Sequence, residues 1–218
     1  MITNDSNLLK EYFFPRITLQ NGNEFIELFQ YLQSIQRIPM NITYFQSLQK
    51  SKNIEIKTEF GPKHILQKTY ILKKTYIHFT INSMKCKVNV YDFEGINRTF
   101  IDTLTNIIQY VFSLSPNTSI KELIVNIYLL DEKKQITKNM TELGKEEVNS
   151  GSCKRGNPTI ITIYRKEELQ KVLIHELIHA FEYDNYEDTD QIIQFYQKKY
   201  NLSSSTINTN ETYTEIWA

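Results

Sequence analysis

Residues 166–184, KEELQKVLIHELIHAFEYD, are the stretch that decides the fold. Apolar side chains recur there at spacings of three and four, which predicts an amphipathic helix. The helix contains His175-Glu176-Leu177-Ile178-His179, an H-E-x-x-H motif. Since positions i and i+4 lie on one helical face, His175 and His179 can direct two imidazoles at one metal ion. We therefore predict a zinc site with these two histidines as ligands. The apolar residues that set the period are Leu169, Val172, Leu173, Leu177 and Phe181.

Glu176 is the predicted catalytic residue of this motif. It follows His175 by about 100° around the helix axis, which places its carboxylate beside the metal and not on it. A carboxylate in that position can take a proton from a zinc-activated water, as a general base. The chain has only four histidines, so two of them bracketing a glutamate at this spacing is seldom accidental. The alternative is a helix whose histidines are ordinary surface or core groups, and such a helix needs no third ligand.

A third ligand is expected because catalytic zinc sites usually take three protein ligands and leave one position to water. Glu211 and Glu215 are four residues apart, so both lie on one helical face. One carboxylate can bind the metal while the other accepts the ring N–H of a ligating histidine. We predict Glu211 as the ligand and Glu215 as the supporting acceptor, with the reverse assignment open and two solvated surface glutamates as the alternative. His64 and His78 fall in a predicted β region and are weaker candidates.

Composition excludes several function classes. The chain has 218 residues, 40% apolar and 23% charged, with 25 basic and 25 acidic side chains. This balance argues against nucleic acid or an acidic membrane surface as a partner. No apolar run approaches the roughly 20 residues of a membrane span, and the N-terminus lacks a secretion signal. We therefore expect an intracellular, cytoplasmic protein in which Cys86 and Cys153 are free thiols.

We expect an α+β fold with two regions, residues 1–95 and 96–218. The first is predicted to hold an N-terminal helix and a β-meander, because the apolar period changes from helical to two near Asn53. The second contains the motif helix, with strands before it and helices around it. The predicted helices of the first region are Asn21–Gln36 and a short one at Met40–Leu48, and its strands are Tyr76–Ile81 and Cys86–Phe93 with a turn at Asn82-Ser83. The second region is predicted to hold helices at Asn97–Leu114 and Asp190–Tyr200, a strand at Leu123–Leu130 buried on both faces, and a strand at Thr159–Tyr164.

Residues 148–218 resemble the gluzincin metallopeptidases. The resemblance is carried by Val148–Gly151, by TIITIYRKEELQKVLIHELIHAFEYD at 159–184, and by NETYTEIWA at 210–218. These runs look most like the predicted zinc metallopeptidases of large nucleocytoplasmic DNA viruses. The resemblance covers about a third of the chain. It implies a zincin-like core, with a small twisted sheet, an active-site helix and a glutamate helix.

The resemblance also implies chemistry: peptide-bond hydrolysis with one Zn²⁺ per chain. It implies His175, His179 and Glu211 as ligands, Glu176 as general base and acid, and Glu215 as the support behind a ligand. In such folds the edge strand before the motif helix pairs with extended substrate. Here that strand would be Thr159–Tyr164, and the candidate substrate contacts are Asn149, Gly151, Ile161 and Tyr213.

The sequence departs from the family at its end. Gluzincins commonly supply a Tyr or His after these motifs to stabilise the oxyanion, whereas this sequence stops at Ala218. Either the chain is a fragment of a longer protein, truncated within this region, or the stabiliser is Tyr213 or Arg165.

Three functions stay open at this point. The first is a zinc peptidase acting on a peptide or protein substrate, without nucleic acid or membrane partners. The second is an inactive zinc-binding module that presents the N-terminal β region to a partner. The third is a zinc hydrolase of non-peptide amides. A vacant coordination position facing a groove would favour an enzyme over a structural module, and a fourth protein ligand would favour the module.

Overall fold

The computed structural model describes residues 30, 33–34, 40–50, 54–58, 61–114, 119–134, 144, 149–185, 187–204 and 207–218. The chain divides into two units, Met1–Gln36 and Arg37–Ala218. The described residues of the first unit, 30 and 33–34, are helical. They fall within the helix predicted for Asn21–Gln36, the rest of which lies outside the described residues. The boundary predicted between residues 95 and 96 lies inside the second unit.

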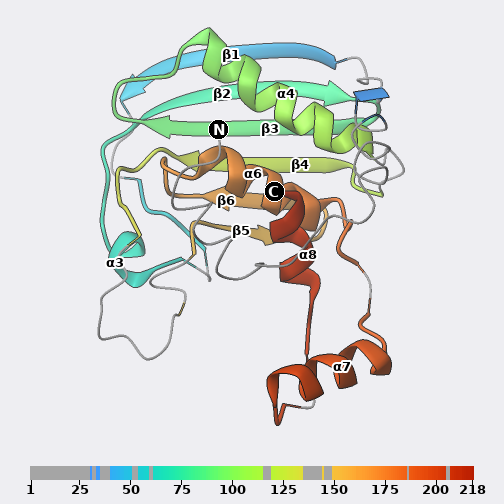
Figure 1. Ribbon diagram of the computed structural model, residues 1–218. Coiled ribbons are helices and arrows are strands. Elements are labelled where there is room, and N and C mark those ends of the chain that lie inside the picture. Colours follow the sequence, from blue (N-terminus) through green and yellow to red (C-terminus); the bar gives the residue numbers. More distant parts are fainter. Residues whose placement is uncertain are drawn as a thin grey trace. The chain divides into compact units, whose positions relative to one another are not determined.

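The second unit is mixed α/β and is built on a six-stranded sheet with the order β1-β2-β3-β4-β6-β5 (Figure 1). The three middle strands β3, β4 and β6 run parallel to one another. The strands at both sides are antiparallel to their neighbours. The bounds are β1 (Met40–Lys50), β2 (Lys73–Ile81), β3 (Met84–Asp92), β4 (Glu122–Tyr128), β5 (Gly151–Lys154) and β6 (Thr159–Ile163).

The hairpin of β2 and β3 confirms the prediction from period-two alternation. Ile81 pairs with Met84 across a turn at Asn82-Ser83. Asn82 has φ +54°, in the left-handed region where Asn is several times commoner than most residues. Every second side chain from Thr75 to Ile81 is buried, so the hairpin turns one face to the core.

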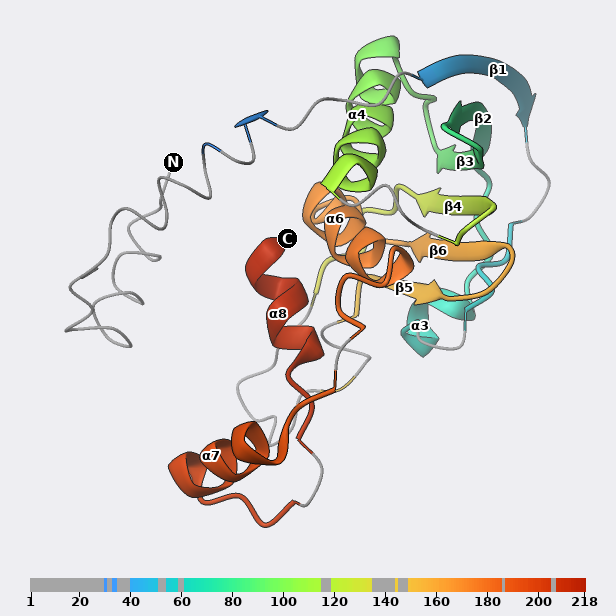
Figure 2. The same cartoon turned by 90° about the vertical axis from the view of Figure 1, so that its right-hand side faces the viewer.

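Two helices cover one face of this sheet. A parallel pair such as β3 and β4 needs a crossover, and α4 (Arg98–Leu114) supplies it, as predicted. The motif helix α6 (Leu169–Ala180) lies on the same side of the sheet as α4 (Figure 2). The main core lies between this pair and the sheet. Its helical part includes Ile101, Leu104, Ile108, Val111, Phe112, Leu173 and Leu177, and its strand part includes Ile77, Val88, Val125, Ile127, Ile161 and Ile163.

A second apolar cluster lies on the other face of β4, because Tyr128 points away from Ile127. It surrounds the short helix α3 (Lys63–Leu66), whose Ile65 is fully buried. Tyr91 and Tyr128 stack on this face with ring centroids 4.5 Å apart. The sheet is therefore packed on both sides near its middle strands.

One predicted element is wrong, and a second is confirmed as a strand but differs in its burial. The short helix expected at Met40–Leu48 is strand β1, which pairs with β2 from Met40↔Ile81 to Gln46↔Thr75. Its β-branched and aromatic residues Ile42-Thr43-Tyr44-Phe45 favour a strand, and the free edge of the hairpin offers a partner. The strand expected to be buried on both faces, now β4, is fully buried only on the face of Leu123, Val125 and Ile127, because Glu122 and Asn126 lie on a half-buried face.

The chain after the motif forms two helices, α7 (Asp190–Tyr200), as predicted, and α8 (Asn210–Trp217). No side chain of α7 is fully buried. Asp188, before α7, contacts Thr209, directly before α8: its Oδ2 accepts from the Thr209 amide at 2.8 Å and its Oδ1 accepts from the hydroxyl at 2.6 Å. This Asp188–Thr209 clasp fixes the point from which α8 starts. Within the described residues, no helix has both the length and the apolarity that a bilayer crossing requires.

Replacing Asp188 by Ala removes both bonds of the clasp. We expect faster amide hydrogen exchange across α8, because its first turn loses the anchor at Thr209. The matched control is Glu187→Ala, which removes the exposed neighbouring carboxylate and should leave α8 protection unchanged. Equal exchange in the two variants would show that the clasp does not hold α8.

Candidate metal centre

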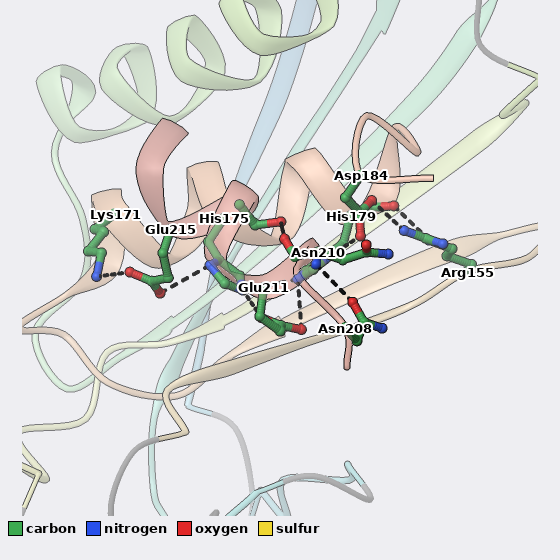
Figure 3. Close-up of polar contacts among 10 residues, drawn as sticks. Arg155, Lys171, His175, His179, Asp184, Asn208, Asn210, Glu211 and Glu215 are labelled. Atoms are coloured by element: carbon green, nitrogen blue, oxygen red, sulfur yellow. Dashed lines mark hydrogen bonds and ion pairs between the residues drawn. The ribbon is translucent and has the colours of Figure 1, made fainter. Parts of the chain in front are cut away.

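Three side chains from two helices converge in front of the sheet (Figure 3). His175 Nε2 lies 3.0 Å from His179 Nε2 on α6. Glu211, at the start of α8, brings Oε2 to 3.3 Å from His175 Nε2 and Oε1 to 3.5 Å from His179 Nε2. With zinc–ligand bonds of about 2.0–2.1 Å, the donors of a tetrahedral site lie about 3.3 Å apart. The triangle of these three groups therefore fits one zinc ion.

The packing of α6 aims its histidines. The predicted helix over residues 166–184 is shorter in the structure, because Phe181 ends it and Glu182 takes φ +59°. Leu173 and Leu177 are fully buried against the sheet, so the stripe with His175 and His179 faces β5 and α8. His64 and His78, in contrast, are exposed on α3 and β2 and do not line the pocket described below.

A buried carboxylate that sequence reasoning missed stands behind His179. Asp184 Oδ2 lies 2.7 Å from His179 Nδ1, within hydrogen-bond distance. Arg155, directly after β5, pairs with the other Asp184 oxygen and donates from Nε to the His179 carbonyl at 2.8 Å. A carboxylate at Nδ1 fixes the ring orientation and directs the lone pair of Nε2 to a metal. The only signal in the sequence was an acidic residue just beyond the end of the motif helix.

Glu215 stands beside the other histidine. Its Oε1 lies 3.2 Å from His175 Nδ1, although the two atoms are not aligned as a hydrogen bond. Its Oε2 pairs with Lys171, one turn earlier on α6. The structure thus brings Glu211 to both Nε2 atoms and Glu215 to an Nδ1 atom. In the pair of glutamates, Glu211 is the one placed to bind a metal.

The histidines and carboxylates of the centre shift one another's pKa values. Burial lowers the pKa of His179, but contacts with Glu211 and Asp184 outweigh it and raise the pKa to about 9. Hydrogen bonds with His175 and His179 lower the pKa of Glu211 far below its ordinary value. A metal ion would take the place of protons at this site, because it binds the neutral imidazole.

Glu176 is nearly buried and faces the same pocket. Burial raises the pKa of its carboxyl to about 7, against the opposing effect of the two histidines. Gly151 of β5 approaches it closely: a Cβ there would lie 3.0 Å from Glu176 Oε1 and 2.7 Å from Val172 Cγ1. Glycine therefore lets β5 run against α6 at the carboxylate.

A pocket of about 550 Å³ is lined by His175, Glu176, His179, Glu211 and Glu215, whereas Asp184 is not among its lining residues. One wall is Asn149–Cys153 with Arg155, the opposite wall is α6, and Glu211 and Glu215 come from α8. Lys134 and Glu168 form an ion pair of 2.7 Å at the rim. Two of the predicted substrate contacts, Asn149 and Gly151, line the pocket. Val148, quoted for the resemblance, lies outside the described residues.

Three of the predicted site residues do not line the pocket. Ile161 is fully buried in the core and offers no side chain to a ligand. Arg165 is also fully buried, and its Nε donates to the Asn149 carbonyl, so it does not face the pocket. Tyr213 is not among the residues that line the pocket. The arginine and lysine side chains among the described lining residues are Arg155, Lys134 and Lys171.

The predicted edge strand is also corrected. Thr159–Ile163, β6, lies between β4 and β5 and is paired on both sides. The sheet edge at the pocket is β5 (Gly151–Lys154), a strand that was not predicted from the sequence.

No family model, curated protein or solved structure matches the chain. The chemistry of the centre is therefore inferred from its own geometry.

Gly151→Ala tests the close approach of β5 to α6. The added Cβ would overlap Val172 and press on Glu176, and overpacking of this kind costs about 1–3 kcal/mol of unfolding free energy. Chemical denaturation measures the loss, with exposed Lys154→Ala in the same strand as the control. A Gly151→Ala protein as stable as that control would contradict the described contact.

Proposed function

We propose that the chain is a zinc-dependent peptidase. The observation that supports this most is the triangle of His175, His179 and Glu211, with edges near those of a tetrahedral zinc site. Among the described residues, these three form the group whose ligand atoms lie close enough together to hold a metal ion. Glu176 lies in the same pocket without being one of the three, as a general base requires.

Each side chain has a role in this proposal. His175, His179 and Glu211 would hold one Zn²⁺ per chain, which when bound supplies Lewis-acid polarisation of a carbonyl and activates water. Asp184 would accept a hydrogen bond from the Nδ1–H group of His179 and so keep its Nε2 free for the metal. Glu176 would take the proton of the attacking water and return it to the leaving amine, which its position on α6, facing the pocket, allows.

An extended peptide is the substrate class that the pocket favours. The edge strand β5 forms one wall, and its backbone can add a further strand to the sheet. Asn149 and Gly151 lie on this wall within reach of such a chain. The finer fold assignment belongs to the same proposal: α6 and α8 would be the active-site and glutamate helices of a zincin-like core. The intracellular location and viral origin suggested by the sequence also stay proposals.

The second candidate, a structural zinc module, is favoured less by the geometry. Structural zinc sites are usually closed by four protein ligands. Among the described residues, three acidic or histidine groups meet here, and Glu211 is 72% exposed at the mouth of the pocket. A site of this kind leaves one position toward the pocket, where a substrate carbonyl can approach.

Zinc binding is the first test. We expect one zinc per chain by mass spectrometry and a higher melting temperature with zinc than with chelator, because a ligand of the folded state stabilises it. His179→Ala should lose the ion. His78→Ala, which removes an exposed histidine outside the pocket, should keep it. Wild-type protein without bound zinc would overturn the proposal.

Peptide hydrolysis is the second test. Glu176→Gln should retain zinc but lose at least about 10²-fold of the rate on a peptide library, because the general base is gone. Chelator should abolish wild-type cleavage, and restored zinc should recover it. Unchanged turnover in Glu176→Gln would remove the base from the mechanism. Zinc binding without cleavage in the wild type would favour the structural module.

A further inference from the structure

Arg155 joins three parts of the metal centre that are distant in sequence. It follows β5 directly, its Nε donates to the carbonyl of His179, and its Nη2 pairs with Asp184. The second oxygen of Asp184 lies at His179 Nδ1 (Figure 3). One guanidinium therefore links the edge strand, the end of α6 and the carboxylate behind a metal ligand.

The chain also contains a matched arrangement at the other histidine. There Lys171 pairs with Glu215, and Glu215 lies 3.2 Å from His175 Nδ1. Both histidines thus have a carboxylate at Nδ1, and each carboxylate has a cation. The two arrangements can be compared directly, because they serve the same ring atom on the same helix.

The two arrangements differ in burial and alignment. The difference lies in the carboxylates: the Asp184 side chain is 5% exposed and that of Glu215 50%, while the cations Arg155 and Lys171 are 41% and 51% exposed. Water and salt screen the exposed pair, so it contributes little. The contact of Asp184 with His179 satisfies hydrogen-bond criteria, whereas that of Glu215 with His175 does not.

Removing the cation should therefore disturb the arrangement at Asp184 and leave the arrangement at Glu215 unchanged. Without Arg155, the buried carboxylate of Asp184 loses its charge partner, which is costly in a site shielded from water. It would then turn toward solvent and leave Nδ1 of His179. Without Lys171, Glu215 is already solvated and keeps its place. A planar guanidinium also suits the task, since its Nε and Nη2 can make two contacts at once.

We propose that Arg155 is a positioning residue of the metal centre, which fixes the ring of His179 by holding Asp184, and that Lys171 has no comparable role. This inference depends on the proposed zinc site. It adds a residue outside the H-E-x-x-H motif, on the edge strand's side of the pocket, to the groups that determine zinc affinity.

The inference is tested by measuring the zinc affinity of the folded variants in competition with a chromophoric chelator. Residues behind metal ligands typically change affinity by about 10–100-fold. We expect Asp184→Ala to fall in that range, Arg155→Ala to bind roughly tenfold more weakly than wild type, and Lys171→Ala to change less than about twofold. The absorption spectrum of the Co²⁺-loaded protein should shift in Arg155→Ala and not in Lys171→Ala, because the ring of His179 reorients.

A double-mutant cycle separates positioning from a general structural effect. If Arg155 acts through Asp184, the double variant should bind zinc no more weakly than Asp184→Ala alone, within about twofold. Independent effects would multiply, and that result would overturn the inference. Arg155→Lys covers the case in which Arg155→Ala does not fold: a lysine ammonium lacks the fixed planar fork of Nε and Nη2 that reaches both acceptors, so we expect at least about threefold weaker binding.

The outcomes distinguish this inference from the proposed function. Wild-type protein that binds no zinc overturns the proposed function, and the inference with it. Wild-type protein that binds zinc while Arg155→Ala, or Arg155→Lys, binds it equally overturns the inference alone. Equal losses in Arg155→Ala and Lys171→Ala would also overturn it, because burial would then not decide the role of the cation.

Discussion

The burial of one stripe of α6 against the sheet is the constraint on which the site depends. Leu173 and Leu177 are fully enclosed in the core, so the helix cannot rotate about its axis without exposing them. At 100° per residue, this leaves His175 and His179 on the stripe that faces β5 and α8. The core thus sets the direction of the two candidate metal ligands, His175 and His179.

Long-range contacts complete what the helix begins. Glu211 comes from α8 and Arg155 from the end of β5, and neither is near the motif in sequence. The close approach of Gly151 to Val172 and Glu176 sets the distance between the edge strand and the helix. The site therefore depends on the positions of α6, β5 and α8. Core packing fixes α6, the Arg155–Asp184 salt bridge links β5 to the end of α6, and the Asp188–Thr209 clasp holds the start of α8.

Much of this arrangement could be predicted from the sequence where the signal is local. The motif helix, α4, the β2–β3 hairpin and β6 follow from period alone, and the spacing of Glu211 and Glu215 indicated two acids on one helical face. What failed depends on pairing between distant segments. β1 is a strand because β2 offers it an edge, and β5 lies in a stretch whose polar composition predicts a loop. The role of Asp184 depends on Arg155, and no sequence spacing connects the two.

The clasp between Asp188 and Thr209 has a consequence for engineering. The two ends of the segment that contains α7 meet where Asp188 contacts Thr209. The helix α7 itself has no fully buried side chain. A short turn, an affinity tag or a fluorescent reporter could therefore replace the described residues 189–204 and 207–208 of this segment while the clasp keeps the start of α8 in place.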